Sequence, residues 1–289
     1  MRLKSKLAAG GLMATALVAS VFAATALASS HNPKGEYAQF AECPLNRVTI
    51  TDCIFSVSNG GEFTVGKKTV PLVNPVTLQG GAEGAGEEVS FYGAENGDTL
   101  SKTPQPVPGG LLGITAPTWW PKSLQEWFNN QINEGLTGVT ATVELAGPTK
   151  GLTNIKLNTE RLLTQEGTAL GLPVKIKLSN AILGNNCYIG SASKPVQLNF
   201  TTGKSGKLEG SVGEITFNEA FTIVTISGGR LVDGTYAAPG VNGCGGIFSF
   251  FIDPLVDSIL GTPSASGKNT AVLEGKLQDA QAEAVKASE

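Results

Sequence analysis

The sequence has a single histidine, His31, in 289 residues. A Ser-His-Asp or Cys-His site needs an imidazole that its neighbours hold within hydrogen-bond reach of the nucleophile. His31 lies near the N-terminus, in a segment that we expect to be flexible. The chain also has neither a Gly-x-Ser-x-Gly elbow nor a His-Glu-x-x-His zinc motif. These absences argue against the common serine esterases, cysteine proteases and zinc hydrolases, and favour a protein that is not an enzyme.

Charge is also scarce, because charged residues make up 16% of the chain, against about 25% in typical globular domains. Glycine is abundant, at 37 residues, and the hydrophobic share is 41%. This composition predicts many turns and extended segments around a sizeable core.

The first 28 residues have the order of a secretory signal peptide, in which a short basic stretch precedes an apolar, alanine-rich run that ends in Ala-Leu-Ala. We expect cleavage after Ala28, although a run of this length could also be a retained membrane anchor. Removal of residues 1–28 takes away three of the 21 basic residues and none of the 24 acidic ones, which leaves a net charge of −6. A mildly acidic chain has no electrostatic reason to bind nucleic acid. The predicted location is extracellular, with association with the cell envelope as a further option.

The four cysteines fit an oxidising compartment, where disulfides form. Of the three ways to pair them, we favour Cys43 with Cys53 and Cys187 with Cys244. Neither pair has Cys-x-x-Cys spacing and no histidine lies near them, so a metal site is the weaker interpretation. We predict no metal and no cofactor.

Short segments with alternating apolar and polar residues follow one another between turn residues, which is typical of β-strands. The predicted strands are residues 62–65, 69–73, 76–78, 89–92, 139–145, 155–157, 174–178, 196–200, 215–217, 221–226 and 270–277.

Residues 61–68 match all but the last position of a phosphate-binding loop, because Lys68 stands where a Ser or Thr would ligate magnesium. No helical pattern follows, so we favour a hairpin between the strands at 62–65 and 69–73.

Two helices interrupt the strands. Ser123 and Glu126 form a Ser-x-x-Glu capping box before a run of apolar residues at helical spacing that ends at Gly135, and we expect its apolar face to pack on a sheet. A second helix is predicted from Asp253, as N-cap, to about Leu260.

The fold class is therefore mainly β, an antiparallel sandwich or open barrel with two short helices. Residues 29–42 are expected to be a flexible lead-in and residues 43–280 a single domain. The proline-rich segment at 103–110 is a candidate subdomain boundary, and residues 281–289 are expected to be a polar tail.

Aromatic residues around the first helix are the best candidates for a binding site. Trp119 and Trp120 precede the helix, and Trp127 and Phe128 lie within it. They could surround the opening of an apolar cavity, offer a platform for a sugar ring, or close the helix against the sheet as a hydrophobic staple.

A glycosidase is the one major hydrolytic class that needs no histidine, because two carboxyl groups suffice. No motif singles out one of the available acids, which are Glu144, Glu160, Glu219, Asp233, Asp253 and Asp257. The sequence therefore gives this reaction little support.

Several segments resemble a group of secreted actinobacterial proteins without assigned activity. The segments are residues 173–178 (PVKIKL), 183–190 (LGNNCYIG), 243–246 (GCGG), 252–255 (IDPL) and 267–271 (GKNTA). The resemblance is most specific in the two Gly- and Asn-rich turns that carry cysteines, and it implies export and a shared β-rich fold.

The function predicted from these observations is that of a secreted, non-enzymatic binding or envelope-associated protein. The expected partner is an apolar small molecule or a component of the cell envelope. The alternative is a carbohydrate-binding module or a weak glycosidase that depends on carboxylates.

Overall fold

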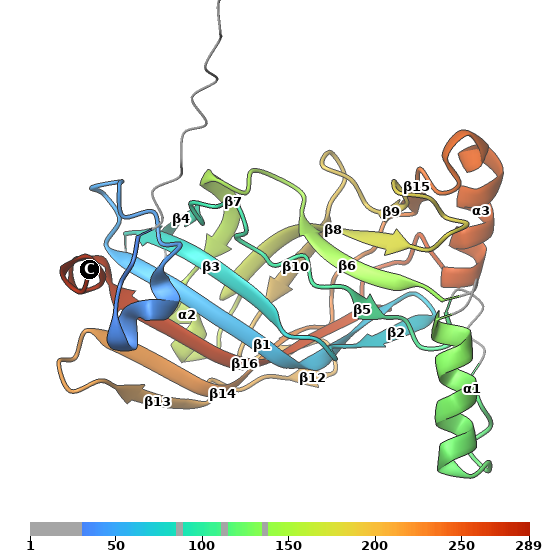
Figure 1. Cartoon of the computed structure of the whole chain (residues 1–289), viewed down its shortest axis with the longest axis horizontal. Helices are drawn as coiled ribbons and strands as arrows, with labels where there is room; N and C mark the ends of the chain where they lie inside the picture. The colour runs from blue at the N-terminus through green and yellow to red at the C-terminus, as the bar shows by residue number, and fades with distance from the viewer. Residues whose placement is uncertain (1–30, 85–88, 111–114, 135–137) are drawn as a thin grey trace, which may run out of the picture.

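The alternating segments form the strands of one large sheet. The computed structural model describes residues 31–84, 89–110, 115–134 and 138–289 (Figure 1). The strands of the large sheet are β1 (Asp52–Val65), β2 (Lys68–Pro71), β3 (Val76–Glu83), β4 (Val89–Gly93), β5 (Gln105–Pro106), β6 (Thr140–Leu145), β7 (Gly151–Leu157), β8 (Leu170–Ser179), β9 (Tyr188–Ile189), β10 (Val196–Phe200), β13 (Glu214–Phe217), β14 (Ile223–Asp233), β15 (Val241–Asn242) and β16 (Thr270–Gln281). A separate small ribbon consists of β11 (Lys204–Ser205) and β12 (Leu208–Glu209).

The sheet is antiparallel and open. Its main path runs β13-β14-β16-β1-β3-β4-β7-β8-β6-β5, with β2, β9, β10 and β15 paired at its sides. An isolated bridge between Thr201 and Val232 connects the end of β10 to β14. The prediction of a mainly β, antiparallel fold is confirmed.

Two β-bulges, one in β1 and one in β14, flank strand β16. The register shifts between Ser58 and Gly60 in β1 and between Ser227 and Gly229 in β14, and both shifts lie opposite Gly275 of β16. A Cβ atom at Gly275 would lie 2.0 Å from the carbonyl oxygen of Val57, so only glycine fits there. Bulges increase the local bend and twist of a sheet. The bulges therefore help to turn the inner face of β1 and β16 toward β8.

The main core fills the space between these two parts of the sheet. In β8, Val174, Ile176 and Leu178 are buried and alternate with half-buried lysines, as the sequence pattern predicts. Residues on both sides of the segment 103–110 belong to the same core, including Ile54 and Val65 before it and Val174 after it. The segment consequently crosses one core instead of dividing two.

Helices occur where the sheet ends or turns. They are η1 (Gly35–Phe40), α1 (Lys122–Glu134), α2 (Thr159–Thr164), η2 (Gly246–Phe248), α3 (Ser249–Leu260) and α4 (Ala282–Ala287). The two predicted helices correspond to α1 and α3, whereas α2 and α4 were not predicted.

Both predicted helices differ in detail from the expectation. Ser123 lies inside α1 because α1 begins at Lys122, and the expected end at Gly135 lies outside the described residues. Helix α3 begins before Asp253, which is not its N-cap. The Asp253 carboxylate instead accepts hydrogen bonds from the backbone N–H groups of Gly243 and Cys244, and so holds the turn that carries the cysteine.

Both predicted disulfides, Cys43–Cys53 and Cys187–Cys244, are present. The second joins the turn after β15 to the residue before β9, where the two strands pair. The residues that the structure describes contain no helix that is both long and apolar enough to span a membrane.

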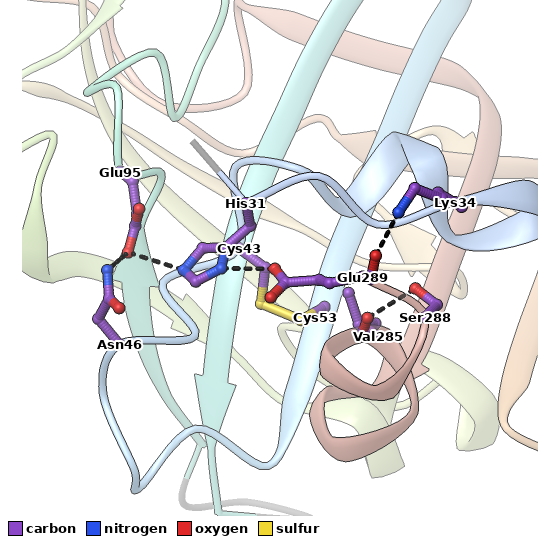
Figure 2. A network of polar contacts seen from close by, with 9 residues as sticks. All are labelled: His31, Lys34, Cys43, Asn46, Cys53, Glu95, Val285, Ser288 and Glu289. Atoms are coloured by element: carbon purple, nitrogen blue, oxygen red, sulfur yellow. Dashed lines mark hydrogen bonds and ion pairs between the residues drawn. A yellow bond between two sulfur atoms is a disulfide. The ribbon is translucent and has the colours of Figure 1, made fainter. Parts of the chain in front are cut away.

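The segments expected to be a flexible lead-in and a polar tail pack against each other instead, as Figure 2 shows. Phe40 and Val285 are buried in one cluster with the Cys43–Cys53 disulfide. His31 lies between two acids, with Nδ1 2.6 Å from Oε1 of Glu289 and Nε2 3.5 Å from Oε1 of Glu95. The described residues of both segments thus pack on the rest of the domain, through a few apolar side chains in an otherwise polar sequence.

Asp279 is a half-buried acid on β16, opposite Ile54 of β1 and Val224 of β14. Burial, followed by the negative charge of Asp52, raises the pKa of Asp279 to about 7. Between about pH 4 and about pH 7 the folded chain thus holds a proton that the unfolded chain has released. The free energy of unfolding should therefore fall as the pH rises through this window.

We expect the melting temperature of the wild-type protein to fall as the pH rises from about 4 to about 7, and the fall to be smaller in Asp279→Asn, which has no carboxyl group to ionise. Thermal unfolding followed by circular dichroism would measure both. The exposed Asp98, replaced by Asn, is the matched control and should melt like the wild type. Equal pH dependence in the wild type and Asp279→Asn would contradict the prediction.

Candidate functional site

An apolar cavity lies inside the fold between the two parts of the sheet. It offers about 80 Å³ to the centre of a water-sized sphere, against roughly 10–15 Å³ that one water molecule requires. Its walls come from both parts of the sheet, with Phe63 of β1 and Leu273 of β16 on one side and Val174 of β8 and Leu198 of β10 on the other. The end of α3 contributes Leu260.

Three polar side chains line this cavity, and two of them are fully engaged by the protein. The side-chain oxygen of Gln105 accepts from the backbone N–H groups of Val73 and Asn74, and its nitrogen donates to the Asn74 carbonyl. The Thr103 hydroxyl is 3.1 Å from the Ser101 hydroxyl. Both groups are therefore satisfied without a ligand.

The third polar side chain, Lys68, begins strand β2 directly after a two-residue turn. β1 and β2 pair from Glu62 with Pro71 to Val65 with Lys68, which confirms the predicted hairpin. Gly66, the first residue of the turn, has a φ of +58°, as a type II′ hairpin turn requires. The hairpin thus fixes where the Lys68 side chain begins.

Contacts with a distant part of the chain hold the hairpin turn in place. The backbone N–H of Gly66 donates to the side-chain oxygen of the buried Asn269, and that of Lys67 donates to the Leu260 carbonyl. The Asn269 amide nitrogen donates to the carbonyl of Tyr236. These bonds tie the turn before β2 to the end of α3 and to the residue before β16, and so position the wall of the cavity at this end.

A second cavity lies further along the interior, under α2. It offers about 60 Å³ to the centre of a water-sized sphere and shares Leu273 with the first cavity. Its lining contains more polar groups, including Ser56, Ser58 and Lys276. The first cavity is therefore the better candidate for an apolar ligand.

None of the four aromatic residues predicted at a binding site lines either cavity. Trp119 is 81% exposed and Trp127 is 59% exposed. Trp120 is half-buried, and its ring meets that of Phe128 edge-on with 5.6 Å between the ring centroids. The expected packing of this helical face on the sheet is not found for Trp127, which faces solvent.

A larger exposed apolar surface, which we call the α3 surface, was missed by the sequence analysis. It consists of Ile247, Phe248, Phe250, Phe251 and Leu255, which are 55–85% exposed. The other side of α3 is buried through Val256 and Leu260. Figure 1 shows α3, α1, β2 and β5 at the same end of the molecule. The aromatic residues before Asp253 are the sequence signal for this surface. The predicted helix began at Asp253 and so did not include them.

Several of the candidate acids for glycoside hydrolysis are engaged elsewhere. The carboxylates of Asp253 and Asp257 accept hydrogen bonds from backbone N–H groups of residues 241–244. Asp233 is fully buried and accepts hydrogen bonds from the backbone N–H groups of Asn199 and Thr235. Glu144 pairs with Lys175 at 3.2 Å. These acids are bound to the protein itself, which does not favour a catalytic role.

No nucleophile is paired with the single histidine, whose described contacts are with the two glutamates. Among the described residues there is also no group of three or more His, Cys, Asp or Glu side chains that could hold a metal ion.

No known family, curated protein or solved structure matches the chain. The resemblance to secreted actinobacterial proteins therefore stays a prediction.

The hairpin turn beside the cavity should tolerate no side chain at Gly66. A Cβ atom there would lie 2.3 Å from the Leu260 carbonyl oxygen, in addition to the strain of a positive φ. We expect Gly66→Ala to lower the free energy of unfolding by about 3 kcal/mol.

Gly151→Ala is the matched control, because Gly151 has a φ of +63° but no heavy atom within 4 Å of the methyl group that the substitution adds. It should cost only about 1–2 kcal/mol, the strain alone. Urea unfolding of both variants measures the difference, and equal costs would show that the contact with Leu260 does not hold the turn.

Proposed function

We propose that the protein is a secreted, non-enzymatic carrier that binds an apolar small molecule in the cavity lined by Phe63, Val174 and Leu198. The observation that carries this proposal is the cavity itself, whose walls are apolar apart from Lys68, Thr103 and Gln105. An apolar cavity in a protein is poorly hydrated, and ligand pockets combine apolar walls with a few polar groups. An apolar ligand would restore the contacts that the cavity walls lack.

Export is supported by two disulfides and by the signal-like order of residues 1–28, which lie outside the described residues. A non-enzymatic role is supported by the contacts of His31 and of the candidate acids, which are made with other groups of the protein.

A ligand in this cavity should be excluded by a larger side chain at Ala141 of β6, which lines it. We expect decan-1-ol to bind the wild type in isothermal titration calorimetry, and Ala141→Leu to weaken binding by about tenfold or more, since the new side chain occupies the space of the ligand.

Ser56→Leu is the matched control, because Ser56 lines only the second cavity. It should leave the affinity unchanged. Native mass spectrometry of protein purified from its producer gives an independent test. No binding of decan-1-ol, together with a clean unliganded mass, would refute the carrier proposal.

Association with a lipid surface of the cell envelope is the second part of the proposed function. Large exposed apolar patches mark interaction sites, and aromatic side chains are favoured at membrane interfaces. The two acids of α3, Asp253 and Asp257, bind backbone groups on its inner side, so neither charge belongs to the exposed α3 surface. Helix α1 lies at the same end of the molecule (Figure 1) and carries the exposed Trp127. The exposed Trp119 contacts Trp120, whose ring in turn meets that of Phe128 of α1.

We expect the protein to bind vesicles of phosphatidylcholine, and the double variant Phe250→Ser/Phe251→Ser to bind about tenfold more weakly or worse, because two apolar rings are lost from the contact. Sedimentation of the vesicles measures the bound fraction. Binding should persist at high salt, since apolar contacts are not screened.

Phe217→Ser/Phe221→Ser is the matched control. These two rings are also exposed and adjacent, with 5.9 Å between centroids, but they belong to the β13 end of the sheet. If both double variants lose vesicle binding equally, docking through the α3 surface is contradicted. A dimer that forms through α3 in solution would contradict it as well.

A carbohydrate-binding module is the alternative, and the exposed ring of Trp119 is the observation that favours it. Trp119 and Trp120 meet at an interplanar angle of 87°, so the two rings do not form one flat platform. This alternative would be favoured over the carrier if the wild type bound a glycan on an array, Trp119→Ala did not, and the wild type did not bind decan-1-ol.

A further inference from the structure

Lys68 occupies a position where the strand pattern places apolar side chains. Strand pairing puts Lys68 opposite Val65 and Val70 opposite Phe63, and side chains of paired residues share one face of a sheet. All four residues line the cavity. The inner face of the hairpin is thus apolar except for one cation.

The Lys68 ammonium has few partners in the protein. Within the described part of the chain, its one hydrogen bond goes to the Gly110 carbonyl oxygen, at a donor-acceptor distance of 3.4 Å. Among the described residues, no carboxylate forms an ion pair with it. An ammonium group has three N–H donors, so most of its hydrogen-bonding capacity is open to a ligand or solvent.

The position of Lys68 also sets the direction of a ligand. Lys68, Val70 and Pro71 are only partly buried, whereas Val174 and Leu198 on the opposite part of the cavity wall are fully or almost fully buried. The cavity therefore extends from a charged, partly exposed end to a dry apolar interior.

We propose that the ligand is an amphiphile with one anionic head group and a single apolar chain, with the head at Lys68 and the chain in the cavity. This inference rests on the proposed carrier function and specifies the class of ligand. The apolar walls select the chain, and the ammonium selects the charge of the head, because a charge-assisted hydrogen bond is stronger than a neutral one.

The partial desolvation of the cation supports the same assignment. Burial lowers the pKa of Lys68 below its ordinary value, since desolvation disfavours the charged form. An anionic head beside the ammonium would offset this desolvation, whereas a neutral or cationic head would not.

Decanoic acid and decan-1-ol test the assignment, because they share one chain length and differ in charge at neutral pH. We expect the wild type to bind decanoate about tenfold more tightly than decan-1-ol in calorimetric titrations at low salt. Decyl phosphate should also bind more tightly than the alcohol, and its affinity relative to decanoate distinguishes the two anionic heads.

Three variants identify the residue responsible. Lys68→Met keeps an apolar side chain of similar length and should abolish the preference for the anion while retaining binding of the alcohol. Lys68→Arg keeps the charge and should retain the preference. Lys67→Met is the matched control, because Lys67 is exposed and its ammonium donates to the Ser258 carbonyl, and it should bind both compounds like the wild type.

The outcomes separate this inference from the carrier proposal. Equal binding of acid and alcohol by the wild type, or an unchanged preference in Lys68→Met, would overturn the inference and leave the carrier proposal standing. Failure of all three compounds to bind the wild type would overturn both. Circular dichroism spectra and melting temperatures show whether Lys68→Met remains folded, and Lys68→Arg tests the charge independently.

Discussion

The fold depends on keeping one face of a long, bent antiparallel sheet dry. Inward residues of β1 and β16 face those of β8 and β10, and the bulges at Gly275 help to bring the two parts together. Because side chains alternate strictly along a strand, each part offers an almost continuous apolar surface. The two surfaces do not fill the whole space between them, and the unfilled space is the pair of cavities.

Long-range polar contacts then determine where the first cavity ends. The buried Asn269 accepts from the Gly66 N–H and the Ser264 hydroxyl and donates to the Tyr236 carbonyl, which joins three separate segments at one side chain. A buried amide is stable only when its hydrogen bonds are made. The Asn269 contacts thus position the hairpin that carries Lys68, so that the cation lies beside the apolar walls.

Part of each longer strand and both disulfides could be predicted from the sequence, because strand alternation and cysteine spacing are local or pairwise signals. The two-residue strands and residues 52–61 of β1 were not predicted. The strict pattern of 174–178 corresponds to buried and half-buried residues in turn. An apolar cavity was one hypothesis from the sequence, but its position and lining could not be predicted, since they depend on the distance between strands far apart in the chain. The contacts of His31 could not be predicted for the same reason, because its partners Glu95 and Glu289 are far from it in the sequence. The exposed Phe250 and Phe251 were missed because a hydrophobic run is normally assigned to the core.

The proposed ligand and the proposed lipid surface impose compatible requirements on the same end of the molecule. An amphiphile that leaves a lipid layer must keep its chain out of water, while its charged head can remain at the boundary with solvent. Helix α3 lies beside the Lys68 hairpin, because its last residue, Leu260, accepts from Lys67 and lines the cavity. Docking through the α3 surface would therefore bring the charged end of the cavity toward the lipid layer. The apolar chain of the ligand would then enter the cavity before its head group. Lys68 is the one charged side chain among the described residues that line the first cavity, so under this proposal no other charge in that lining competes for the head.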